Sequence, residues 1–243
     1  MTGLFRGFSY VFRGLGLLTH KGIRGFVVIP LLINILLFAG GIWLAEQQAA
    51  YWMQHLLPDW LSWLRYILWP LFVVVIFFAV FYGFTLLANL IAAPFNAMLA
   101  ECIEKQLKGQ PLPEFGGLAT LPGIMARTFR SELGKLWYMG KWLVLILLIT
   151  VIPGVNLIAP LAWLLYGAWM LAIEYVDYPM GNHELYFQDE LKALKRQRGH
   201  ALGFGAALTL LTAIPVVNFL VMPIGVAGAT VLWVDRISKG PAA

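Results

Sequence analysis

The chain has 243 residues, of which 60% are hydrophobic and 12% are charged, and its mean hydropathy is +0.78. Soluble domains carry about 25% charged residues, so this composition excludes a soluble globular domain and predicts an integral membrane protein. The net charge of +5 is explained by basic residues at the level of lipid headgroups, so nucleic acid is not an expected partner.

Residues 3–18 are predicted to form an amphipathic helix on the membrane surface. Four apolar residues recur at helical spacing, and two arginines lie off their face. These residues are Phe5, Phe8, Phe12 and Leu15, with Arg6 and Arg13.

Four charge-free runs predict helices inside the bilayer: residues 25–45, 66–100, 142–173 and 201–234. About 20 apolar residues cross a hydrocarbon core of about 30 Å. The first two runs therefore predict two long transmembrane helices, over residues 23–56 and 60–107. One Lys or Arg lies in residues 46–65, against four before the first run and twelve after the second. This asymmetry predicts cytoplasmic termini.

The last two runs each contain the phrase Ile-Pro-x-Val-Asn, which starts at Ile152 and at Ile214. The prolines divide the runs into arms over residues 142–152, 161–173, 201–214 and 224–234. Arms of 11–14 residues reach about 16–21 Å, which is too short to cross. We therefore predict two re-entrant helical hairpins that penetrate half of the bilayer. Two kinked spanning helices are the alternative.

The whole chain, residues 1–243, is predicted to be one all-α membrane domain. In it an amphipathic helix leads into the first hairpin over residues 124–173, and a polar connector leads into the second over residues 187–235. Asn156 and Asn218 end the two phrases, and their amides are expected to replace missing backbone partners. Non-helical backbone at this depth must be buried in protein or line a wet cavity. The turns therefore favour a pore or a homo-oligomer.

A candidate anion site lies at the predicted start of the first transmembrane helix, in Lys21-Gly22-Ile23-Arg24-Gly25. A helix N-terminus offers N–H donors and a partial positive charge, and an arginine adds a planar fork that suits an oxyanion. Gly22 lets a ligand approach the backbone. The alternative is an ordinary basic helix end in contact with lipid phosphate.

Polar residues on one face of the second helix are candidates for pore lining. Thr85, Asn89 and Asn96 share that face, and Asn34 on the first helix is expected to face it. Hydrogen bonds between membrane helices are the equally weighted alternative.

Charged residues at the predicted membrane boundary are candidates for gating: Glu101, Glu104, Arg127 and Arg130. Ionisable residues at such depth often mark ion paths. A structural ion pair between Glu101 and one of the two arginines is the favoured interpretation.

Enzyme signatures are absent from the sequence. His183-Glu184 lacks the second histidine of H-E-x-x-H, and no G-x-S-x-G occurs. Cys102 is the single cysteine, so an intrachain disulfide is excluded. No catalytic residue, metal site or cofactor is expected.

Taken together, Lys21-Gly22-Ile23-Arg24, Ala92-Ala93-Pro94-Phe95-Asn96, Asp177-Tyr178-Pro179, Asn182-His183 and the twin turns resemble the CysZ sulfate permeases of bacterial inner membranes over essentially the whole chain. The resemblance implies sulfate uptake for cysteine synthesis, two long spanning helices and two half-penetrating hairpins. It also implies an oligomer in which protomers can insert in opposite orientations, whereas the Lys and Arg count predicts one orientation.

The family's sulfate site is similar to Gly22, Ile23 and Arg24, and Gly25 stands where some relatives have a second arginine. We therefore expect a sulfate permease. A scaffold that shapes the membrane with paired hairpins is the competing function, and Asn89 and Asn96 count against it because a scaffold needs no polar stripe. The sequence leaves open whether a permease would be a channel or a proton-coupled transporter.

Overall fold

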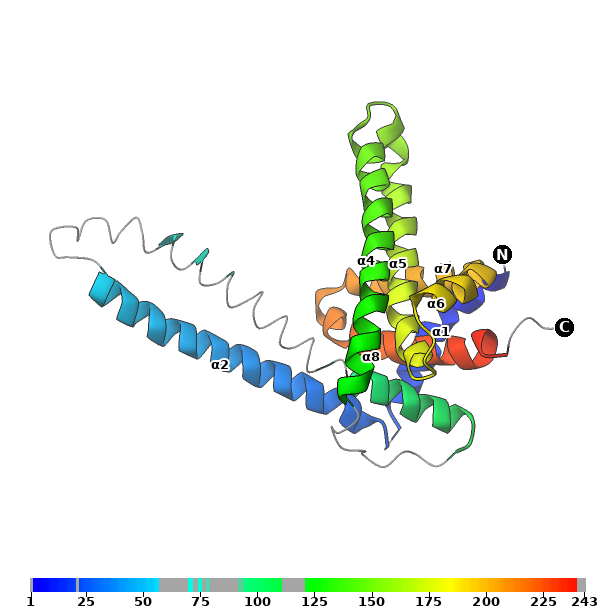
Figure 1. The fold of residues 1–243 in the computed structure, drawn as a ribbon, viewed down its shortest axis with the longest axis horizontal. Coiled ribbons are helices and arrows are strands. Elements are labelled where there is room, and N and C mark those ends of the chain that lie inside the picture. Colours follow the sequence, from blue (N-terminus) through cyan, green and yellow to red (C-terminus); the bar gives the residue numbers. More distant parts are fainter. Residues whose placement is uncertain are drawn as a thin grey trace. The chain divides into compact units, whose positions relative to one another are not determined.

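The computed structural model describes residues 2–20, 22–56, 94–110 and 121–239, together with residues 70–71, 74–75, 78 and 92. All regular secondary structure among these residues is helical (Figure 1). The chain forms two compact units: Gly25–Phe95 is one, and Met1–Arg24 with Asn96–Ala243 is the other. The predicted all-α class is therefore confirmed for the described residues.

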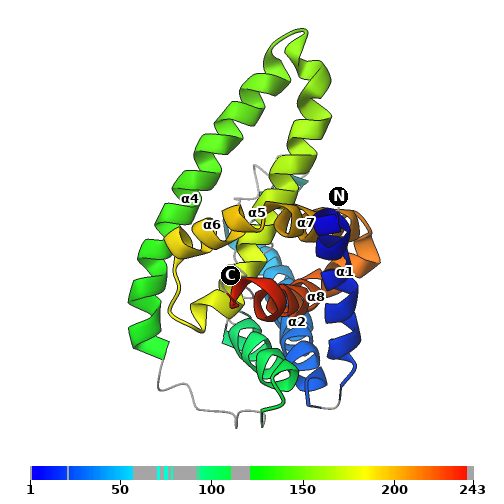
Figure 2. The same ribbon diagram turned by 90° about the vertical axis from the view of Figure 1, so that its right-hand side faces the viewer.

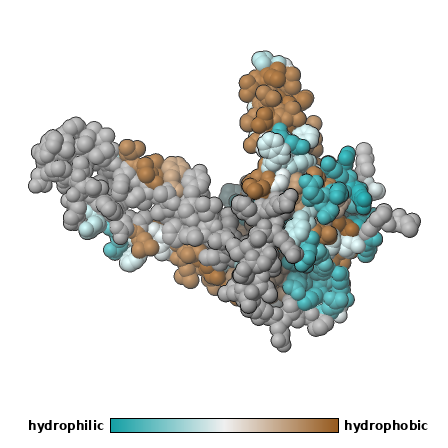
Figure 3. All heavy atoms as spheres, in the orientation of Figure 1, coloured by the Kyte–Doolittle hydropathy of each residue, from teal (hydrophilic) through white to brown (hydrophobic). Residues whose placement is uncertain are grey.

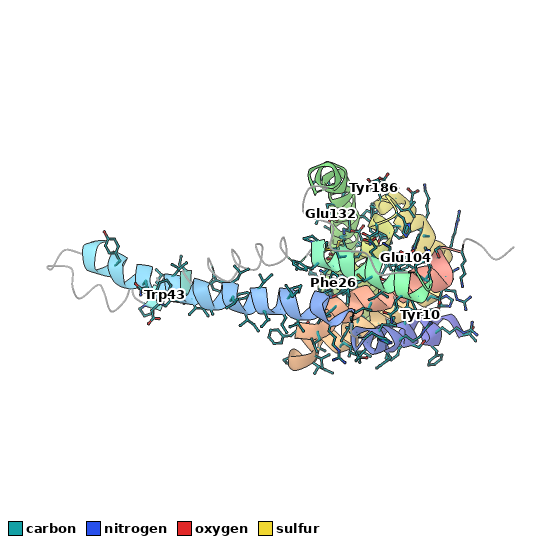
Figure 4. All side chains as sticks on the ribbon, turned by 90° about the horizontal axis from the view of Figure 1, so that it is seen from below. Tyr10, Phe26, Trp43, Glu104, Glu132 and Tyr186 are labelled. Atoms are coloured by element: carbon teal, nitrogen blue, oxygen red, sulfur yellow. The ribbon has the colours of Figure 1, made fainter. Side chains whose placement is uncertain are left out.

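The unit Gly25–Phe95 contains almost all of helix α2 (Arg24–Leu56), which continues through Pro30. Residues Arg24–Leu44 are long and apolar enough to cross a membrane. Trp43, labelled in Figure 4, lies on α2 with 58% of its surface exposed. Most of the second predicted transmembrane helix lies outside the described residues. Its residues 94–107 are described and are helical, and from Asn96 onward they belong to the other unit.

Helix α1 (Thr2–Leu18) presents two different faces. The predicted apolar face is exposed at Phe5, Phe12 and Leu15. The opposite face is buried, and its residues are Gly7, Tyr10, Val11 and Gly14. This face packs against α7 (Arg198–Thr212) and α8 (Pro215–Leu232), as Figures 1 and 2 show. Helix α1 is therefore part of the core as well as a surface element.

Glycines allow the helices of this core to meet backbone to backbone. A methyl group added to any of three glycines would overlap a carbonyl oxygen of the neighbouring helix. The pairs are Gly7 with His200, Gly203 with Leu4, and Gly205 with Ala168. Small residues at helix contacts are typical of membrane proteins, where close van der Waals packing replaces hydrophobic drive.

The first hairpin consists of α4 (Leu121–Val151), the short helix η3 (Val155–Ile158) and α5 (Ala159–Gly181). Its turn contains Gly154, whose φ of 84° lies in the left-handed region that favours glycine. The tip is exposed and apolar, with Leu157 84% exposed, and Figure 3 shows hydrophobic residues covering this end of the hairpin. The predicted break at the first phrase is present.

The arms of the first hairpin are longer than predicted. Apolar segments of 20 and 27 residues, Glu132–Val151 and Val155–Gly181, are each long enough to cross a membrane. The predicted arms over 142–152 and 161–173 are therefore too short, because charged residues were taken to end them. The helices continue through Lys135 and Glu174, which pair with each other.

The second hairpin follows the connector helix α6 (Phe187–Arg196) and consists of α7, α8 and the short π-helix η4 (Trp233–Ile237). Ile214 is extended, as is usual before proline, and Pro215 starts α8. Pro223 lies inside α8 and does not end it. The predicted arm over 224–234 is therefore wrong: this helix begins at Pro215 and contains Asn218.

The side chains of Asn156 and Asn218 do not cap the two turns. Their backbone N–H groups donate to the carbonyls of Ile152 and Ile214, at 3.0 Å and 2.9 Å. Neither side-chain amide is hydrogen-bonded to another described residue, and both residues are exposed. The expected capping role is therefore not observed, and both tips present polar side chains to their surroundings.

Candidate functional site

The turn between α1 and α2 carries the predicted anion site. Helix α1 ends at Leu18 and α2 begins at Arg24, so few residues connect them. Ile23 is completely buried and anchors the turn, whereas Gly22, Arg24 and Gly25 are exposed. One buried side chain therefore fixes the turn, and the residues beside it remain accessible to a ligand.

The guanidinium of Arg24 is held by one of its three nitrogens. Its Nε donates to the carbonyl of Thr19 at 2.7 Å, and the hydroxyl of Thr19 donates to the carbonyl of Gly16 at 2.8 Å. Among the described residues, no partner occupies the two Nη groups. An arginine held through Nε keeps its outer edge oriented for a planar contact with two oxygens of a ligand.

Two backbone donors of the predicted site are used within the turn. The carbonyl of His20 accepts the N–H of Ile23 at 3.0 Å and the N–H of Arg24 at 3.3 Å. The expectation of free N–H groups at these two positions is therefore wrong, because the tight turn satisfies them locally. The described contribution to an anion comes from the Arg24 side chain and the partial charge of the helix start.

The other predicted site residues fall into two groups. Outside the described residues or side chains lie Asn34, Thr85, Asn89, Arg127 and Arg130. The described ones are Asn96, Glu101 and Glu104. Asn96 is 5% exposed, and its amide nitrogen has no hydrogen-bond partner among the described residues. Glu101 pairs with Lys105 at 2.7 Å, on its own helix.

Glu104 lies in a buried polar cluster (labelled in Figure 4) rather than on an open surface. His183 Nε2 lies 2.9 Å and 2.8 Å from its two oxygens, and Lys108 Nζ lies 2.6 Å from Oε1. The indole of Trp233 also donates to Oε1 at 3.3 Å. Three chain segments therefore converge on one carboxylate, which joins helix 94–107 to the α5–α6 loop and to η4.

A second charged cluster surrounds Lys135 on α4, whose side chain is 4% exposed. Its Nζ lies 2.9 Å from Glu132, 3.1 Å from Asp177 and 3.4 Å from Glu174. Sequence reasoning did not single out Lys135. The available signal was the pair of i,i+3 spacings, 132 with 135 and 174 with 177, on helices that form one hairpin.

Glu190 on α6 is fully buried near this cluster, and neither of its carboxyl oxygens has a hydrogen-bond partner among the described residues. Burial raises the pKa of Glu190 well above its ordinary value, and the charge of Asp177 raises it further. The carboxyl is therefore neutral at a pH where exposed carboxyls are ionised. Sequence reasoning also missed this residue, because a glutamate in a polar connector predicts an exposed position.

Comparisons with known proteins agree on one family. The family described as sulfate transporter CysZ/etoposide-induced protein 2.4 matches residues 10–223. A sulfate transporter CysZ of Pseudomonas fluorescens is 45% identical over 232 residues, which cover 94% of this chain and 92% of the relative. Those of Pectobacterium atrosepticum and Pseudomonas aeruginosa are 42% and 44% identical; they cover 95% and 94% of this chain, and 85% and 94% of the relatives.

Proposed function

The chain belongs to the sulfate transporter CysZ/etoposide-induced protein 2.4 family, and on that premise we propose that it carries sulfate across the bacterial inner membrane to supply cysteine biosynthesis. Its relatives of similar length are named sulfate transporters. Four described helices are long and apolar enough to cross a membrane, which fits a multi-pass transporter. Transport, rather than an enzymatic reaction, is the function of this family.

Sulfate binds, in this proposal, at Gly22–Gly25, with Arg24 as the principal ligand. The observation that carries it is the exposed guanidinium at the start of α2, held by Nε and open at its outer edge. Sulfate has oxygens that match this fork. With Gly25 next to it, the site offers one arginine, so the dianion is only partly neutralised. Partial neutralisation suits permeation, because a transported ion must leave as well as enter.

Replacement of Arg24 by alanine should lower sulfate flux at least about tenfold, since charge-assisted hydrogen bonds contribute about 1.5–3 kcal/mol. The measurement is uptake of radiolabelled sulfate into proteoliposomes that contain equal amounts of protein. Arg24→Lys keeps the charge but loses the fork, so it should recover only part of the flux. Flux unchanged in Arg24→Ala would exclude this role for Arg24.

Two controls accompany this measurement. Lys192→Ala removes an equal charge from an exposed pair with Asp189 on α6 and should leave flux unchanged. Wild-type protein that remodels liposomes without carrying sulfate would favour the membrane-shaping function instead.

A homo-oligomer, including one with antiparallel protomers, is part of the same proposal. Leu157 and Phe219, at the tips of the two hairpins, are 84% and 76% exposed in the single chain, beside polar Asn156 and Asn218. Amide groups in contact with lipid tails are costly, so contact with other subunits would stabilise the tips. A pore would then form between subunits.

Half-penetration of the hairpins can be tested by labelling their tips. In a Cys102→Ser background, Asn156→Cys and Asn218→Cys should resist a membrane-impermeant maleimide supplied on both sides of the bilayer, because a tip at half depth meets no bulk water. Lys192→Cys, in the exposed connector, should react readily. Rapid reaction at Asn156→Cys would mean that the first hairpin emerges on the far side, as its arm lengths allow. Rapid reaction at Asn218→Cys would likewise contradict half-penetration of the second hairpin.

A further inference from the structure

Basic side chains from three helices gather where the first turns of α1 and α7 cross. The backbones of Gly3 and Gly199 are in contact there: a methyl group on Gly3 would lie 3.6 Å from Gly199 and 3.7 Å from the His200 ring. Figure 2 shows the starts of these two helices side by side. Arg6 lies between Gly3 and Gly7 on α1, and both glycines contact the start of α7.

The third basic group comes from η4. Arg13 of α1 forms an ion pair with Asp235, and its guanidinium also lies over the ring of Tyr10 at 5.5 Å. This pair joins η4 to α1 about two turns beyond Arg6, and Arg236 follows Asp235 directly in η4. The ring of Tyr10 in turn lies 6.3 Å from that of His200.

The charges at this place are not balanced. Asp235 is already bonded to Arg13. Arg6 and Arg236 have no carboxylate partner among the described residues, and the positive charges of both are felt by the His200 ring. Nε2 of His200 is buried and has no hydrogen-bond partner in the described part of the chain. Burial lowers the pKa of His200, and the charges of Arg236 and Arg6 lower it further.

We propose that Arg6, His200 and Arg236 form a second oxyanion site, separate from Gly22–Gly25, that binds a tetrahedral anion such as a lipid phosphate or a free phosphate. Arginine forks bind such oxyanions through paired hydrogen bonds. A bound anion removes the repulsion between the two arginines and gives Nε2 of His200 an acceptor. Basic pockets at membrane surfaces recognise lipid headgroups by the same chemistry.

The test uses the full chain with Arg24→Ala, so that the proposed transport site does not contribute. In one arm, native mass spectrometry measures retention of phosphatidylglycerol against phosphatidylcholine. In the other arm, calorimetry measures binding of inorganic phosphate to detergent-solubilised protein. Arg6→Gln with Arg236→Gln should weaken binding at least about tenfold in one arm, and the arm that responds identifies whether the anion is a lipid headgroup or free phosphate.

Lys192→Gln with Lys195→Gln removes the same charge from exposed positions on α6 and should leave binding unchanged. A second readout is the pKa of His200 by NMR, assigned with His200→Gln, which should rise when the anion binds. Equal losses in the two double variants, or no binding in either arm, would overturn the proposal. A pKa of His200 that is indifferent to a bound anion would also overturn it.

Discussion

Gly205→Ala is expected to unfold or severely destabilise the unit that contains α1, α5, α7 and α8. An added methyl group would overlap the carbonyl oxygen of Ala168, which is backbone and lies in the middle of α5. Overpacking usually costs about 1–3 kcal/mol because side chains can adjust. Here two helix backbones must separate. Their separation would also disturb the contact between Tyr175 on α5 and Gly225 on α8. We therefore expect the upper end of this range or more.

The measurement is the thermal midpoint of detergent-solubilised protein, followed by the amount of folded protein. Gly140→Ala is the matched control: it lies inside α4, and nothing lies within 4 Å of the position of the added methyl group. That substitution should stabilise the protein by up to about 1 kcal/mol through helix propensity. A Gly205→Ala protein as stable as the Gly140→Ala protein would contradict the backbone packing described above.

The contrast between the two faces of α1 shows how far periodicity can predict packing. Its apolar face follows from Phe5, Phe12 and Leu15, which are large and regularly spaced. Its buried face depends on Gly7 and Gly14, and glycine alone lowers helix propensity by about 1 kcal/mol. The benefit of these glycines comes from the partner backbone, which lies roughly two hundred residues away in the sequence. From the sequence alone, the glycines of that face predict only a less stable helix.

Each of the twin phrases was predicted to form the turn of a hairpin, and the backbones of the two turns differ. Gly154 adopts a positive φ in the first phrase and permits a turn followed by η3. Val216 occupies the matching position in the second phrase, where a β-branched residue disfavours positive φ. The chain instead extends at Ile214 and enters α8 directly at Pro215. The two turns therefore differ although their phrases share most of their first residues.

The sequence identifies the residues of the candidate anion site, but it does not predict which of their hydrogen-bond donors are free. Composition and position identify Arg24 as a basic residue at a helix start. Only the geometry of the turn shows that His20 accepts the N–H groups of Ile23 and Arg24, and that Thr19 orients the guanidinium. Such bonds depend on how tightly six or so residues connect two helices, which the pattern of hydrophobic and charged residues does not encode.

Lys135→Met is expected to destabilise the α4–α5–α6 region by about 3 kcal/mol. Removal of one partner from a buried ion pair costs about 3–5 kcal/mol, and the lower end applies because the carboxylates are partly exposed. Lys135 is the group that Glu132, Glu174 and Asp177 share. Lys192→Met breaks an exposed pair with Asp189 and should cost only about 0–1 kcal/mol. Similar losses in both variants, measured by chemical unfolding in detergent, would mean that Lys135 is not the hub of its cluster.

The neighbouring Glu190→Gln variant should change stability in the opposite direction, and in a way that depends on pH. Because burial raises the pKa of Glu190, the folded protein keeps this proton above pH 4.5, the ordinary value at which the unfolded chain releases it. Wild-type stability therefore falls as pH rises from 4.5 toward the raised pKa, whereas glutamine has no proton to lose. The stability advantage of Glu190→Gln should grow over this window. An advantage that is constant from pH 4.5 to 8 would show that Glu190 is not held neutral beside Lys135 and its carboxylates.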